Sequence, residues 1–128
     1  MVESKKFVIP SLPPSVNAIY QIIFSQRRVE MKGEVRLWKT EAKSVIPKLN
    51  PLADSNLFRL NAVFYYDFFF KNGKVRKFDT HNLMKVLQDA VAEKNGFEDS
   101  LIKFNMIESY HSPDKEYVEC ELQQVTNE

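Results

Sequence analysis

The chain has 128 residues, of which 44% are hydrophobic and 27% are charged. These values predict one compact domain, residues 1–128, because single domains most often have about 100 to 150 residues. Three glycines and 12% aromatic residues exclude a collagen-like or disordered chain. There is no apolar run of ~20 residues and no secretory signal, and Cys120 is the only cysteine. We therefore expect a cytoplasmic protein without disulfides, in which Cys120 is a small buried residue.

The charges are unevenly distributed along the chain. Up to Leu87 there are 15 Lys and Arg against 7 Asp and Glu, whereas from Gln88 onward there are 3 against 10. A basic surface beside an acidic one suits a polyanionic partner together with a metal-binding or catalytic site. Uneven placement of solvated surface charge explains the same counts equally well.

The apolar patterning and turn signals predict two helices and several strands. In chain order they are a strand 6–9 ended by Pro10, a β-prone segment 18–24, a helix 36–46, a strand 57–70, a return strand 74–78, a helix 79–94, and closing strands 101–110 and 116–125. This order predicts an α+β fold with a mixed, mostly antiparallel sheet and two main helices.

The strand 57–70 has the clearest pattern, because alternate residues from Phe58 to Phe70 are apolar and predict a buried face. Asn72-Gly73 then predicts a two-residue hairpin turn, after which the chain returns antiparallel. Four cations gather at this predicted tip: Lys71, Lys74, Arg76 and Lys77.

The helix 79–94 has two different faces. It begins at the capping residues Asp79-Thr80 and ends before Asn95-Gly96, a common left-handed stop. Apolar residues fill one arc of the helix and predict its core side. The opposite arc carries side chains that could do chemistry: His81, Asn82, Lys85 and Asp89.

Asp79 and Asp99 each stand at a predicted element end, where two carboxylates could converge. Converging carboxylates hold Mg²⁺, which can orient a phosphodiester and activate a water molecule. Lys85, about one and a half turns after Asp79, could offset negative charge on the phosphate. Taken singly, Asp79 is equally explained as a helix cap, and Asp99 and Lys85 as solvated surface charges.

Three blocks of the chain, in order, resemble the RusA-type Holliday junction resolvases. The first is similar to a Pro-Pro-Ser-x-Asn-x-x-Tyr signature and reads Pro13-Pro14-Ser15-Val16-Asn17-Ala18-Ile19-Tyr20. The second is similar to Asp-x-Asp-Asn-Leu-x-Lys and reads Asp79-Thr80-His81-Asn82-Leu83-Met84-Lys85, followed by Gln88-Asp89-Ala90-Val91. The third is similar to Asp-Asp-x-Gln-Ile and reads Glu98-Asp99-Ser100-Leu101-Ile102.

The resemblance implies a homodimeric endonuclease of phage or prophage type, which acts in DNA recombination and repair. Such an enzyme nicks four-way DNA junctions symmetrically and depends on Mg²⁺, for which Mn²⁺ is the alternative. The implied catalytic residues are Asp79, Lys85 and Asp99. The implied metal-binding residues are Asp79, His81, Glu98 and Asp99, and Asp89 falls at the edge of the site. For DNA contact we expect Asn17, Tyr20 and Asn82, together with Lys71, Lys74, Arg76 and Lys77 at the hairpin tip.

His81 is the main departure from the family pattern, which usually has an aspartate there; Leu101 in place of a glutamine is a milder one. An imidazole is a poorer Mg²⁺ ligand than a carboxylate and suits Mn²⁺, Zn²⁺ or Co²⁺ better. An alternative function follows, that of a catalytically impaired relative that binds branched DNA or a partner protein without cutting.

Overall fold

The computed structural model describes residues 3–14, 20–23, 28–31, 33–49, 57–76 and 80–125, with only the backbone at residues 20–23, 28–31 and 80–82. Its main layer is a four-stranded sheet of order β1-β6-β4-β5. The strands are β1 (Ser4–Ile9), β4 (Leu57–Tyr66), β5 (Ile102–His111) and β6 (Tyr117–Val125). β6 pairs antiparallel with β1 and β4, whereas β4 and β5 are parallel.

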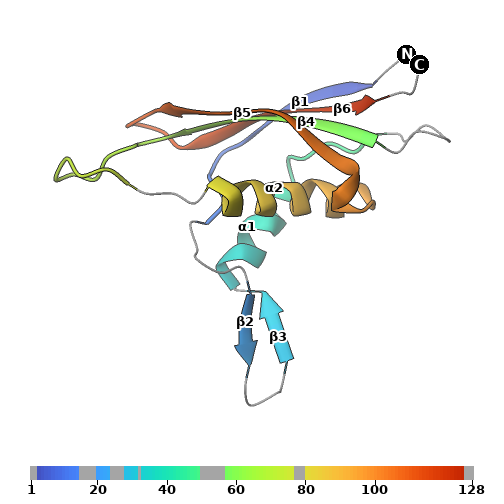
Figure 1. Ribbon diagram of the computed structural model, residues 1–128, viewed down its shortest axis with the longest axis horizontal. Helices are drawn as coiled ribbons and strands as arrows, with labels where there is room; N and C mark the ends of the chain where they lie inside the picture. Colours follow the sequence, from blue (N-terminus) through green and yellow to red (C-terminus); the bar gives the residue numbers. More distant parts are fainter. Residues whose placement is uncertain are drawn as a thin grey trace.

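Two helices, α1 (Gly33–Lys43) and α2 (Thr80–Asn95), lie on one face of this sheet (Figure 1). The predicted α+β fold, with a mixed, mostly antiparallel sheet and two main helices, is therefore confirmed. A separate ribbon of β2 (Tyr20–Ile23) and β3 (Arg28–Met31) extends from α1 away from the sheet (Figure 1). Within the described residues, no helix is long and apolar enough to cross a membrane.

The connection from β4 to β5 carries α2 across the sheet. Parallel neighbours cannot be joined by a tight turn, so the chain must cross over between them. It does so through a hairpin, α2 and a short 3₁₀ turn, η2 (Asp99–Leu101), which leads directly into β5. This crossover brings most of the residues that the sequence marked for chemistry onto α2 and η2.

The core lies between the sheet and the two helices. Alternate residues of β4, from Phe58 to Phe64, are at most 1% exposed, as the sequence predicted. The prediction that this buried face continues to Phe70 is wrong, because β4 ends at Tyr66 and Phe70 is 56% exposed in the hairpin. On α2 the residues from Leu83 to Val91 at helical spacing are equally buried. β6, which lies beside β4 in the same sheet, contributes Val118, Cys120 and Leu122 to the core. Burial raises the pKa of the Cys120 thiol to about 12, so it is an inert core residue, as expected.

The hairpin after β4 differs from the prediction. β4 ends at Tyr66, and in the described part of the predicted return strand, residues 74–76, the pairing is a single bridge between Phe69 and Val75. The loop has three residues instead of two, because the Phe70 N–H donates to the Lys74 carbonyl at 2.7 Å. Gly73 takes the left-handed position, with φ 83°, and its N–H donates to the Phe70 carbonyl. A type I turn followed by a left-handed glycine explains the geometry.

The helix predicted over residues 36–46 is also displaced, since α1 spans Gly33–Lys43. After Lys43 the backbone N–H groups donate to carbonyls three residues earlier instead of four, as in a 3₁₀ helix. The Ser44 N–H donates to the Glu41 carbonyl and the Val45 N–H to the Ala42 carbonyl. Such tightened turns are common at helix C-termini, and the helix therefore ends before Pro47.

Candidate active site

The turn after α2 determines where Asp99 lies. Gly96 has φ 76° and ends the helix by donating its N–H to the Ala92 carbonyl, as the Asn95-Gly96 stop predicted. Phe97 then stacks on Phe58 of the core, with ring centroids 4.1 Å apart. Because Phe97 is held there, the following residues run back along α2.

Gln88 of α2 fixes this returning segment. Its side-chain amide donates to the Asp99 carbonyl at 2.7 Å and to the Ile102 carbonyl at 3.1 Å. These two bonds hold both ends of η2 against the helix, next to Asp89. The η2 turn is therefore a fixed part of the site.

The Asp89 and Asp99 carboxyl groups meet at this point. Burial and a hydrogen bond with the Asp99 carboxyl raise the pKa of Asp89 to about 6, whereas Lys39 and Lys85 act to lower it. Burial disfavours the charged carboxylate most, and the neighbouring Asp99 carboxyl adds to this effect. Asp89 therefore loses its proton just below neutral pH, where its carboxylate becomes available to a cation.

Lys85 supplies the exposed positive charge of the site. It lies one turn before Asp89 on α2, and residues at that spacing share a face of a helix. Its side chain is exposed, so the ammonium can reach a bound anion as well as Asp89. The phosphate-binding role that the sequence suggests for Lys85 stays a prediction.

Two lysines of α1 form ion pairs with α2 beside this pair. Lys39 is 6% exposed and forms an ion pair with Glu93, one turn after Asp89 on α2. Lys43 binds the same carboxylate at 3.0 Å. Burial alone would raise the pKa of Glu93, but the hydrogen bonds from Lys39 and Lys43 outweigh it and lower the pKa.

Glu98 and Asp99 are neighbours in sequence but have different surroundings. Glu98 is exposed, and its carboxylate accepts a 3.5 Å hydrogen bond from the Ser100 hydroxyl. It is also the N-terminal cap residue of η2, without a side-chain capping bond. The structure thus brings Asp99, but not Glu98, into contact with Asp89.

Several predicted site residues lie outside what the structure describes. Asp79, Asn17 and Lys77 fall outside the described residues, while His81 and Asn82 belong to α2 and Tyr20 to β2 by their backbone only. In the described part of the chain, no three His, Cys, Asp or Glu side chains form a group that could hold a metal ion.

The described cations of the hairpin tip divide into two kinds. Lys71 and Lys74 are exposed. Arg76 is partly buried and donates to the Asp67 carbonyl at 3.0 Å and to the Glu116 carboxylate at 2.9 Å. It therefore anchors the base of the hairpin to the turn before β6, whereas the two lysines face solvent.

The structure adds two residues to the predicted site, Asp89 and Lys39. Asp89 was expected only at its edge, yet it contacts Asp99 directly. Lys39 has a signal in the sequence, because it lies at helical spacing from Val35 and Ala42 on the core side of α1. A lysine at such a position must be paired when it is buried.

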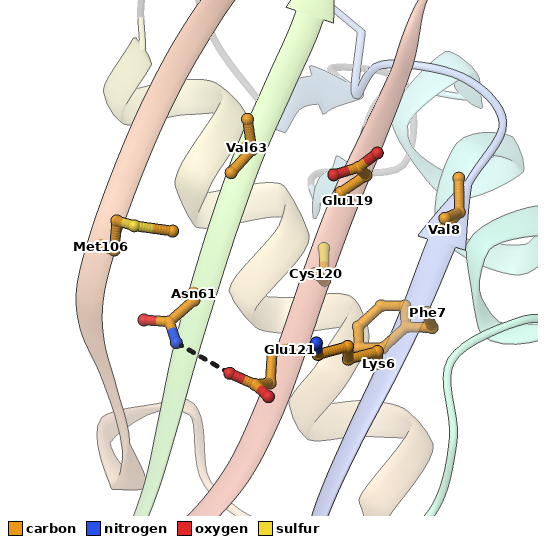
Figure 2. A pocket seen from close by; sticks show the side chains of 9 residues that line it. All are labelled: Lys6, Phe7, Val8, Asn61, Val63, Met106, Glu119, Cys120 and Glu121. Carbon is orange, nitrogen blue, oxygen red and sulfur yellow. Dashed lines mark hydrogen bonds between the residues drawn. The ribbon is translucent and has the colours of Figure 1, made fainter.

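A groove on the other face of the sheet is separate from this site. Its volume is about 430 Å³, and it crosses β1, β6, β4 and β5, with Lys6, Val8, Val63 and Met106 among its lining residues (Figure 2). Asn61 and Glu121 hydrogen-bond across it at 3.3 Å.

No protein-family model matches the chain, and the comparison with curated proteins finds no significant match. The functional argument therefore depends on the residues and their geometry.

Proposed function

We propose that this protein is a metal-dependent endonuclease that resolves four-way DNA junctions by hydrolysing phosphodiester bonds. The observation that carries the proposal is the contact between Asp89 and Asp99, with the exposed Lys85 one turn away on α2. Carboxylates for a metal and a cation for a phosphate are the groups that such a reaction needs. The three ordered sequence blocks support the same function.

The donor atoms fit a hard divalent cation. Asp89 and Asp99 offer only carboxylate oxygens, which Mg²⁺ and Mn²⁺ prefer. Both carboxylates would hold the ion, and further ligands would come from Asp79, His81 or Glu98. A bound ion would supply Lewis acidity and lower the pKa of an attacking water.

The other residues would bind and orient the DNA. The Lys85 ammonium would stabilise the charge that develops on the phosphate, while Lys71 and Lys74 would neutralise backbone phosphates further away. One chain carries one such site, so symmetric cutting of two strands requires two chains. A cytoplasmic homodimer with two-fold symmetry would match the symmetry of the junction.

A cleavage assay tests the proposal. Purified protein is incubated with a labelled four-way junction and, as a control, the matching linear duplex, with Mg²⁺ and Mn²⁺ in turn. We expect paired nicks in the junction alone, lost in Asp99→Asn and Asp79→Asn. Absence of cleavage with either ion would refute the enzymatic function.

His81 favours a second candidate function, binding of branched DNA or of a partner protein without cutting. An imidazole in place of the family's aspartate removes one negative ligand and should weaken Mg²⁺ binding. The discriminating variant is His81→Asp. Cleavage by this variant alone would support the binding function, whereas equal activity of both proteins would rule it out.

A further inference from the structure

Lys39 is a buried cation that belongs to none of the three sequence blocks. Its side chain is 8% exposed, whereas that of Lys43, one turn later on α1, is 33% exposed. Burying an ammonium group costs free energy unless charged partners compensate. Lys39 has such partners on α2, where Glu93 binds it directly and Asp89 attracts it.

A lysine and two carboxylates lie in a row along this face of α2. Lys85, Asp89 and Glu93 follow one another at intervals of one helical turn. Lys39 reaches this row from α1 and is attracted by both of its carboxylates. The remaining neighbour of Asp89 is Asp99, which Gln88 holds in place through the backbone.

We infer that Lys39 is a positioning residue, which holds Asp89 against Asp99 from the buried side of the site. The inference rests on the proposed function, because it gives Lys39 a role in shaping a metal-binding carboxylate pair. Lys39 contacts neither the metal nor the DNA and acts through Asp89. The physical reason is that the ion pair with Glu93 fixes the Lys39 ammonium between α1 and α2. From that fixed position it attracts the Asp89 carboxylate, which a freely moving solvated lysine would not hold in place.

Metal binding to the full-length, metal-free protein tests this role without DNA. The dissociation constant of Mn²⁺ is measured by electron paramagnetic resonance for the wild type, Lys39→Met and Lys39→Arg. Loss of a residue that orients a ligand typically costs about 10- to 100-fold in metal affinity or activity. We expect at least tenfold weaker binding for Lys39→Met and near wild-type binding for Lys39→Arg.

Lys43→Met is the matched control, because Lys43 binds the same Glu93 carboxylate from the more exposed position. It should leave Mn²⁺ affinity within about twofold of the wild type, as surface ion pairs contribute little. Equal loss in both variants would overturn the inference. Unchanged or tighter binding by Lys39→Met would also overturn it, since a cation acting by charge alone repels Mn²⁺.

A double-mutant cycle separates this inference from the proposed function. Urea unfolding in EDTA is measured for Lys39→Met, Asp89→Asn and the double variant, with Lys43→Met in a parallel cycle. Non-additive midpoint shifts in the first cycle alone support positioning of Asp89 by Lys39. Additive shifts overturn it. A wild type that binds no Mn²⁺ would refute the metal-dependent function, and this cycle would still decide the role of Lys39.

Discussion

The carboxyl groups of Asp89 and Asp99 hydrogen-bond to each other, one from the middle of α2 and the other from the turn that leads into β5. Neither residue alone would indicate a site, because single acids on helices and turns are usually solvated. Their contact, with two lysines nearby, forms a group with the charge and the donor atoms to bind a cation and a phosphate.

Asp89→Asn should alter how stability depends on pH. The folded-state pKa of Asp89, about 6, exceeds the ordinary value of 3.8. Its contribution to stability is therefore fully present below about pH 3.8 and is lost as the pH rises through about 6. Two pKa units correspond to about 3 kcal/mol, which solvent screening at this half-exposed site reduces to about 1 kcal/mol.

The measurement is thermal unfolding of both proteins in EDTA from pH 4 to 7.5. The stability of Asp89→Asn relative to the wild type should increase between pH 4 and 6.5 and then level off. A difference that stays constant over this range would contradict the raised pKa of Asp89.

Divalent ions should stabilise the protein through Asp99 more than through Glu98. Ligands that bind only the folded state raise the melting temperature in proportion to the logarithm of their concentration. We expect Mn²⁺ at pH 7.5 to stabilise the wild type and Glu98→Gln, but not Asp99→Asn, in differential scanning fluorimetry. If Glu98→Gln removed the effect and Asp99→Asn retained it, the two acids would have been assigned in reverse.

Lys85→Met should impair cleavage without affecting folding. Lys85 is exposed, so its loss should change stability by less than about 0.5 kcal/mol. Removing a group that stabilises charge in the transition state typically lowers the rate by about 10² to 10³. Single-turnover cleavage of a junction measures this effect, with the exposed Lys103 of β5, changed to Met, as the control. A rate within threefold of the wild type would remove Lys85 from the mechanism.

The two hairpin lysines and Arg76 should give different phenotypes. Lys71→Ala with Lys74→Ala should weaken DNA binding and reduce the slope of log K against log salt by up to about 2, because each phosphate contact releases counterions. The melting temperature should stay unchanged. Arg76→Ala should lower it, since Arg76 binds Glu116 and the Asp67 carbonyl. Fluorescence anisotropy at several salt concentrations, with thermal unfolding, distinguishes the two cases.

Gly96→Ala should destabilise the turn that returns the chain to the site. Gly96 has φ 76°, and a left-handed conformation costs a residue with a Cβ about 1 kcal/mol or more. No heavy atom lies within 4 Å of the added Cβ, so the cost comes from the backbone alone. Gly33→Ala at the start of α1 is the control and should be neutral or slightly stabilising. Urea unfolding of both variants checks this, and equal effects would contradict it.

The local sequence determined most of the fold. Alternation in β4, the apolar arc of α2 and the Asn95-Gly96 stop each depend on neighbouring residues. The last two predictions are confirmed, and the first is confirmed as far as Phe64, because Phe70 lies in the hairpin beyond β4 and is exposed. The hairpin was predicted less well, because a two-residue and a three-residue loop around Asn72 and Gly73 differ only in backbone hydrogen bonds. In the structure the Gly73 N–H donates to the Phe70 carbonyl, and this bond makes the loop one residue longer than predicted.

The sequence by itself identified Asp99 and Lys85 as candidates, because their residue types and spacing suit phosphate chemistry. Only the tertiary structure decided that Asp89 is the partner of Asp99 and that Lys39 lies behind it. These contacts depend on the reversal at Gly96, the stacking of Phe97 on Phe58 and the packing of α1 against α2. Such contacts join residues far apart in the chain, and no local pattern of residues encodes them.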